Sequence, residues 1–287
     1  MLTIAIANLK GGVGKSTTTV CLAEALALHH RKRVLILDLD PQANTSFMLL
    51  SRQGVDQADF AGRTLTNFLL DQGRNTISDY VRAGATDVNE ILANKNCAVD
   101  ILPSIPRVWF VEETLQEAAY KSGNDPAKQL VKMFTPHLAA LREHYHLCLI
   151  DCPPGFSSLT RAGVMLANAI ISPTIADPVS TRSLADFVRL GLPMLEADTK
   201  PHYVVITKYQ PRNTTEPIRD LLRSTYNVLE PSIRYSTHML EATERIRNDS
   251  FRTFRNKYSS LEADVIALAG DAERKILRPF QSVPTKR

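Results

Sequence analysis

The amino-acid sequence predicts an α/β fold: a single doubly wound, mainly parallel sheet flanked by helices. Two observations lead to this prediction. Short apolar runs alternate with helical patterns along the chain, as they do in consecutive βαβ units. The first run, residues 2–7, leads directly into a glycine-rich loop, and a helical pattern follows at 16–29. Because no Pro- or Gly-rich linker divides the 287 residues, one domain over 1–287 is expected, with a basic helical part from about residue 200.

The predicted strands are short runs rich in Val, Ile and Leu, which is typical of strands buried on both faces of a parallel sheet. After 2–7 they fall at 34–37, 99–103, 147–150, 169–172 and 203–207. Amphipathic patterns predict helices at 111–121, 127–143, 157–166, 181–195 and 216–226. The least regular stretch, 50–84, predicts short helices and loops, whereas 239–277 is helical apart from a break near 257–260.

The composition excludes several classes of protein. Hydrophobic residues make up 44% of the chain and charged residues 22%, values that do not fit a disordered or fibrous protein. No apolar run approaches 18 residues, and the first ten residues lack the features of a signal peptide, so neither a transmembrane helix nor secretion is expected. Four cysteines without paired spacing argue against a disulfide scaffold and fit a reducing cytosol.

The formal net charge of +4 is unevenly distributed along the chain. Residues 200–257 carry 11 basic and 6 acidic side chains, whereas residues 1–199 carry 18 and 20. A basic surface in this late segment could meet an anionic polymer or a membrane. It could equally be an ordinary solvated face, and the charge counts alone do not decide between the two.

The strongest motif is the loop at residues 8–17, which reads NLKGGVGKST and lies between a predicted strand and a predicted helix. Its glycines allow backbone N–H groups to surround phosphate oxygens, and the helix N-terminus adds positive dipole. Lys15 is expected to reach the β- and γ-phosphates, Ser16 to bind Mg²⁺ and Thr17 to donate to the α-phosphate. An ordinary phosphate loop has a glycine where this chain has Leu9, and here Lys10 precedes the glycines instead.

Carboxylates follow two of the predicted strands. Asp38 and Asp40 come directly after the strand at 34–37, in the segment DLDPQ. Asp151 ends the strand at 147–150 and is followed by the turn CPPG. Because a doubly wound fold binds its ligands at the carboxyl ends of its strands, these side chains are expected to lie beside the glycine loop.

In combination, the loop KGGVGKST, the segment DLDPQ and the segment DCPPG resemble the deviant Walker A ATPases of the ParA/MinD family, and the ParA (Soj-like) partition branch in particular. The resemblance implies that Lys10 reaches the ATP of the other subunit in a dimer, as an arginine finger does. It implies that Asp40 positions the attacking water and that Asp38 and Asp151 lie at the Mg²⁺ site with Ser16. The residues that would bind ATP are Lys10, Gly11, Gly12, Val13, Gly14, Lys15, Ser16 and Thr17.

The same resemblance extends to weaker segments late in the chain. The segment after the strand at 203–207 would border the adenine, through Lys208 and Pro211, and Arg212 would contact DNA. Arg234 would also contact DNA, by likeness to an arginine in a family segment near this position.

The function implied is an ATP-dependent, Mg²⁺-dependent switch ATPase that forms a homodimer on binding ATP. It would bind DNA non-specifically, position plasmid, chromosome or other cargo, and hydrolyse ATP slowly until a ParB-like or adaptor protein stimulates it. Such a protein would be cytoplasmic and associated with the nucleoid. The sequence does not name the cargo.

Two alternatives share the phosphate loop. A MinD-like membrane-associated ATPase would need a terminal amphipathic helix, and the tail 277–287 contains two prolines and few bulky apolar residues. A relative of the nitrogenase iron protein would need two cysteines that bridge a cluster, and Cys97 and Cys152 do not fall where the ligands would.

Overall fold

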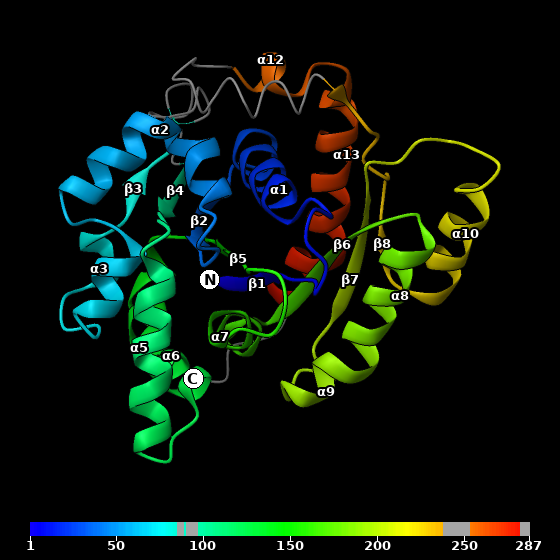
Figure 1. Cartoon of the computed structure of the whole chain (residues 1–287). Helices are drawn as coiled ribbons and strands as arrows, with labels where there is room; N and C mark the ends of the chain where they lie inside the picture. Colours follow the sequence, from blue (N-terminus) through cyan, green and yellow to red (C-terminus); the bar gives the residue numbers. More distant parts are fainter. Residues whose placement is uncertain (85–88, 90–96, 238–252, 282–287) are drawn as a thin grey trace.

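The computed structural model describes residues 1–84, 89, 97–237 and 253–281. A sheet of eight strands runs through the described part of the chain, in the order β3-β4-β2-β5-β1-β6-β7-β8 (Figure 1). Neighbouring strands pair in parallel except for β3, which is antiparallel to β4 at the edge. The strands are β1 (Leu2–Ile6), β2 (Arg33–Asp38), β3 (Arg82–Ala83), β4 (Ala98–Leu102), β5 (Leu147–Asp151), β6 (Ala169–Ile175), β7 (His202–Thr207) and β8 (Val228–Leu229).

Helices cover both faces of the sheet (Figure 1). On one face α1 (Lys15–His30), α2 (Asn44–Phe60), α12 (Phe254–Tyr258) and α13 (Glu262–Ala272) share a hydrophobic cluster with the strands. On the other face lie α3 (Leu65–Leu70), α5 (Val108–Lys121), α6 (Pro126–Ala140), α7 (Ser158–Leu166) and α9 (Leu192–Met194). The other α-helices in the described part of the chain are α8 (Pro178–Asp186), α10 (Glu216–Thr225) and α14 (Arg278–Gln281). Helices on both faces of a mostly parallel sheet confirm the predicted doubly wound class.

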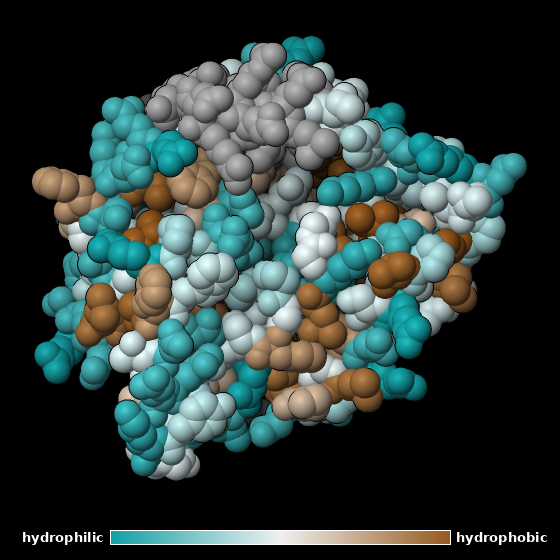
Figure 2. Space-filling model, viewed as in Figure 1, coloured by the Kyte–Doolittle hydropathy of each residue, from teal (hydrophilic) through white to brown (hydrophobic). Residues whose placement is uncertain are grey.

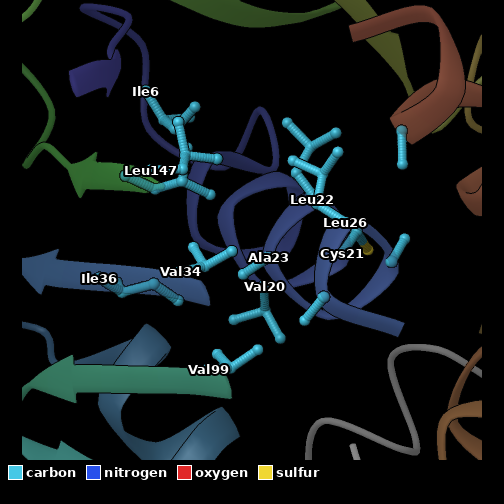
Figure 3. Packing of buried hydrophobic residues seen from close by; sticks show 14 of the residues in the cluster. Ile6, Val20, Cys21, Leu22, Ala23, Leu26, Val34, Ile36, Val99 and Leu147 are labelled. Atoms are coloured by element: carbon cyan, nitrogen blue, oxygen red, sulfur yellow. The ribbon is translucent and has the colours of Figure 1, made fainter. Parts of the chain in front are cut away.

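Alternation along the central strands explains why their sequences are apolar throughout. Val34 and Ile36 of β2 pack in the cluster under α1, whereas Leu35 and Leu37 pack in the cluster on the opposite face. Figure 3 shows Val20 and Ala23 of α1 beside Val34 of β2, with Val99 of β4 next to Val20. Burial of both faces therefore requires an apolar residue at every position, which is the pattern seen in the sequence.

Each of the six predicted strands is present, with ends that differ by at most a few residues, and the structure adds two short edge strands. β3 and β8 contain two residues each, too few to produce a period in the sequence. Residues 50–84 form short helices and loops, as predicted: α2 reaches Phe60 after a kink at Ser51, whose φ of 60° and ψ of 175° are not helical, and the short helix α3 follows. That kink breaks the helical period of the segment.

The predicted helix at 181–195 is present, but its winding is not uniform. α8 ends at Asp186, five residues of wider π-helix follow at Phe187–Gly191, and α9 completes the segment. The predicted break near 257–260 is present, since α12 ends at Tyr258 and a short turn at Ser259–Leu261 precedes α13. The part of the predicted helical region at 239–252 lies outside the described residues. None of the helices that the structure describes is long and apolar enough to cross a bilayer.

Candidate nucleotide site

The glycine loop lies at the carboxyl end of β1 and opens directly into α1. Gly12 and Gly14 have φ angles of 74° and 89°, which glycine adopts without strain. A Cβ built on Gly11 or Gly12 would have no heavy atom within 4 Å, so the backbone of the loop faces open space. The loop therefore presents its backbone and the N-terminus of α1 to the outside, in the arrangement that binds phosphate.

Lys15, the first residue of α1, lies across this loop. Its side chain is buried, and its Nζ donates a hydrogen bond to the carbonyl of Lys10 at 3.1 Å. Burial lowers the pKa of Lys15, whereas the nearby carboxylates of Asp151 and Asp40 act in the opposite direction. A positive charge is thus held at the loop with carboxylates beside it.

Asp38 and Asp151 are neighbours at the carboxyl ends of β2 and β5, where they pair in the register of the sheet. Both side chains are fully buried. Burial and the mutual repulsion of the two carboxylates raise the pKa of Asp38 well above its usual range, and burial also raises the pKa of Asp151. On its other side, Asp151 of β5 pairs with Ile6 of β1, the strand that leads into the loop. The two carboxylates therefore lie next to each other and close to the loop, as predicted.

Asp40 lies in the turn after β2. Its side chain is 6% exposed, and its Oδ1 accepts a hydrogen bond from the backbone N–H of Gln42 at 2.9 Å. Burial raises the pKa of Asp40, and the hydrogen bond from Gln42 and the charge of Lys15 oppose that rise. A carboxylate near the loop lysine can accept a hydrogen bond from a water, so this placement is compatible with the predicted role.

The oxygen ligands near the loop fit Mg²⁺. Asp38, Asp151 and the Ser16 hydroxyl supply hard oxygen donors, and Oδ1 of Asp151 is enclosed without a hydrogen-bond partner among the described residues. Within the part of the chain that the structure describes, no group of three or more His, Cys, Asp or Glu residues could hold a metal by itself. Mg²⁺ commonly keeps several waters and is bound by one or two carboxylates together with substrate phosphates, which is what this set would provide.

The side chain of Lys10 contacts the N-terminus of α8. Its Nζ donates to the hydroxyl of Ser180 at 2.7 Å and lies 3.8 Å from the carboxylate of Asp177. Asp177 caps the N-terminus of α8 by accepting a hydrogen bond from the backbone N–H of Ser180. Neither Ser180 nor Asp177 was predicted to belong to the site. The signal for Asp177 was its place just after strand β6, which is similar to the place of Asp38 at the end of β2.

A small cavity of about 60 Å³ lies beside the loop, between the N-terminal part of α1 and the segment after β7. Lys208, which is predicted to border the adenine, lines this cavity, and its Nζ donates to the carbonyl of Gly12 at 2.8 Å. Pro211 is exposed and is not among the described residues that line the cavity. Ile233 and Tyr235 do line it, and no spacing in the sequence pointed to them.

The two arginines predicted to contact DNA are placed differently. Arg212 is exposed in the turn after β7, where its guanidinium donates to Gln210. Arg234 lines the cavity and forms an ion pair with Asp264 of α13, N to O at 2.7 Å. It also donates a hydrogen bond to the carbonyl of Ser260, in the turn before α13. Contact of either arginine with DNA stays a prediction.

The phosphate loop between β1 and α1, with carboxylates ending β2 and β5, defines a P-loop nucleoside triphosphatase that carries a second loop lysine. A family model described as an AAA domain matches residues 1–196. The chromosome partitioning protein ParA of Caulobacter vibrioides is 31% identical over 217 residues, which cover 74% of this chain and 71% of that protein. The chain belongs to this AAA-domain family, in its ParA/MinD branch, as the motifs predicted.

Solved structures share the fold over nearly the whole length. A plasmid partition protein of Borrelia burgdorferi B31 bound to AMPPNP has a TM-score of 0.72 at 20% identity, covering 96% of this chain and 99% of that chain. Cobyrinic acid a,c-diamide synthase of Mycobacterium smegmatis, with a bound ATP analogue and magnesium, has a TM-score of 0.65 at 22% identity, covering 98% and 96%. These two structural similarities establish the fold of the chain, which proteins of different activities share.

Proposed function

We propose that this chain is an ATP-dependent, dimerising switch ATPase of the partition and positioning type, a single domain over residues 1–287 that binds DNA non-specifically. The observation that carries the proposal is the placement of the Lys10 ammonium. Lys15 already supplies the charge that a phosphate loop needs, and Lys10 adds a second ammonium, which contacts Ser180 and Asp177 at the N-terminus of α8. A cation in that position is suited to a nucleotide bound by another copy of the chain.

The nucleotide chemistry is assigned as follows. Lys15 neutralises the β- and γ-phosphates, the residues from Gly11 to Thr17 bind them, and Lys208 borders the base. Asp40 orients the attacking water, and Ser16, Asp38 and Asp151 hold Mg²⁺. Magnesium would neutralise phosphate charge as hydrolysis proceeds. Support comes from the structural neighbours, one solved with AMPPNP and one with an ATP analogue and magnesium.

Dimerisation has support from the surface next to Lys10. On the face shown in Figure 2, hydrophobic side chains gather over the region where Figure 1 places α8 and α9. Exposed apolar residues there are Phe156, Val179, Leu190 and Met194. Val179 precedes Ser180, the residue that holds Lys10. An apolar surface beside the lysine that would act in a partner subunit is what an ATP-dependent dimer needs.

The DNA-binding part of the proposal rests on the basic segment 200–257 and on the relative named for chromosome partitioning. Arg212 is the best-placed side chain, because it is exposed, and Arg234 would have to leave Asp264 to reach a phosphate. A ParB-like or adaptor protein would stimulate hydrolysis and so release DNA. We place this action in the cytoplasm over the nucleoid.

The test is the state of the purified chain with different nucleotides. Light scattering and duplex-DNA binding are measured without nucleotide, with ADP and Mg²⁺, and with AMPPNP and Mg²⁺. We expect a dimer and DNA binding with AMPPNP and Mg²⁺ only. A chain that stays monomeric in all three conditions, or binds DNA equally in all of them, contradicts the proposal.

Reversing the charge of Arg212 should weaken DNA binding. Arg212→Glu is expected to lower the affinity of the AMPPNP-bound chain for duplex DNA about tenfold and to reduce the salt dependence of binding, because a phosphate contact is lost. Fluorescence anisotropy over a salt titration measures both quantities. The matched control is Arg142→Glu, which makes the same charge change at an exposed residue beside Met1, at the amino end of β1. Equal effects of the two changes would remove Arg212 from the DNA surface.

A further inference from the structure

The first turn of α2 connects two buried carboxylates on adjacent strands. The hydroxyl of Thr45 donates to Oδ2 of Asp151 at 2.6 Å. The hydroxyl of Ser46, the next residue, donates to Oδ2 of Asp38, also at 2.6 Å. All four side chains are 0% exposed. Consecutive residues of one helix therefore hold the carboxylates that end β2 and β5.

The two carboxylates are held in different ways. Asp38 accepts further hydrogen bonds, from the backbone N–H groups of Ser46 and Asp40, so both of its oxygens are occupied. Asp151 accepts the Thr45 hydroxyl on Oδ2 only, and its Oδ1 has no hydrogen-bond partner among the described residues. An enclosed carboxylate oxygen without a partner is costly, unless a bound ligand or ion completes it.

The open oxygen belongs to a carboxylate at the phosphate loop. The Ser16 hydroxyl is near enough to Asp151 to favour its charged form, and Lys15 acts in the same direction. Rotation of the carboxylate would remove Oδ1 from this position, and the bond to Thr45 opposes rotation. Thr45 is itself well fixed, because it is β-branched, fully buried and in the first turn of a helix.

We propose that Thr45 is a positioning residue, whose hydroxyl orients the Asp151 carboxylate so that Oδ1 is available to Mg²⁺ bound with nucleotide at the loop. This inference rests on the proposed nucleotide chemistry of the site. Outer hydrogen-bond partners of this kind set the orientation and basicity of the carboxylates they hold. The connection that carries Asp40 and Gln42 runs directly into Thr45, so the same short segment links the predicted water-positioning residue to Asp151.

The experiment uses the full chain and a fluorescent ATP analogue that is not hydrolysed, titrated with Mg²⁺ at fixed analogue concentration. Thr45→Val removes the hydroxyl and keeps the shape of the side chain. We expect it to raise the Mg²⁺ concentration for half-maximal analogue binding about tenfold. Thr45→Ser retains the donor and is expected to stay within about twofold of the unmodified chain.

The matched control is Thr66→Val, the same change at a buried residue of α3 whose hydroxyl has no hydrogen-bond partner among the described residues. It should leave the Mg²⁺ dependence unchanged. Thermal unfolding without nucleotide checks that each variant is folded, and Thr45→Ala replaces Thr45→Val if the latter is not.

The outcomes separate this inference from the proposed function. If the unmodified chain does not bind the analogue with Mg²⁺, the proposed function fails and this inference fails with it. If the unmodified chain binds it and Thr45→Val has the same Mg²⁺ dependence, the role of Thr45 alone is overturned. An equal shift in Thr45→Val and Thr45→Ser would also overturn it, because the hydroxyl would then not be the cause.

Discussion

Replacing Lys10 by alanine is expected to reduce ATP turnover at least about 100-fold and to leave ATP binding within a few-fold. The ammonium of Lys10 contacts Ser180 and Asp177 at the N-terminus of α8, so we expect the chain's own nucleotide to lose little binding when this ammonium is removed. In a dimer the same ammonium would neutralise charge that develops on the transferred phosphoryl group, an effect large in the transition state and small in the ground state.

The measurement is steady-state ATP hydrolysis with duplex DNA, together with binding of a fluorescent ATP analogue. Lys15→Ala is the comparison that should lose binding as well, since Lys15 lies across the loop itself. Lys121→Ala is the control for charge, because Lys121 is exposed on α5 and paired only with Glu117 of the same helix among the described contacts. Unchanged turnover in Lys10→Ala would show that hydrolysis does not need a lysine from a second subunit.

Removing the amino group of Lys257 is expected to destabilise the fold by about 3–5 kcal/mol. Lys257 of α12 places its Nζ 3.0 Å from both carboxylate oxygens of Glu24 in α1, and the two side chains are 4% and 1% exposed. The hydroxyl of Tyr258 also donates to Glu24. Without Lys257 the Glu24 carboxylate would stay buried with the Tyr258 hydroxyl as its remaining side-chain donor among the described residues, which is far less favourable than the pair.

Urea unfolding of Lys257→Ala measures this loss. The double variant Glu24→Gln with Lys257→Met removes both charges and is expected to recover most of it, because the penalty comes from the unpaired charge. Lys128→Ala removes a member of an exposed pair with Glu196 and should cost less than about 1 kcal/mol. A loss below about 1 kcal/mol in Lys257→Ala would mean that water reaches Glu24 in solution.

The buried pair also matters for the site. It joins α12, which follows residues 238–252 in the sequence, to α1, the helix that begins at the phosphate loop. Arg234, at the cavity beside the loop, is tied to α13 next to α12. Unfolding of α12 is therefore expected to disturb the cavity side of the nucleotide site as well as the core.

The six longer strands and the phosphate loop could be predicted because their information is local. Val34 to Leu37 are apolar at each position, and that pattern alone indicates a strand buried on both faces. The positions of Lys15, Asp38 and Asp151 follow in turn, since carboxyl ends of parallel strands meet at one edge. The sequence did not predict that residues 44–60 join into one helix across Ser51, or that the helix at 181–195 contains a π-helical stretch, because a kink and a π-helix interrupt the period from which helices are recognised.

The sequence by itself determined the family, the fold class and the residues of the loop, because each depends on the order of neighbouring residues. Only the tertiary structure decided which distant side chains contact and orient the residues of the site and the core. Thr45 meets Asp151 across 106 positions, Lys10 meets Ser180 across 170, and Glu24 meets Lys257 across 233. Such pairs depend on the order of strands in the sheet and on how helices pack over it. They have no characteristic separation in the sequence by which they could be recognised. The residue types of the site can therefore be identified from short local segments of the sequence, whereas the orientation of their side chains depends on how the fold packs.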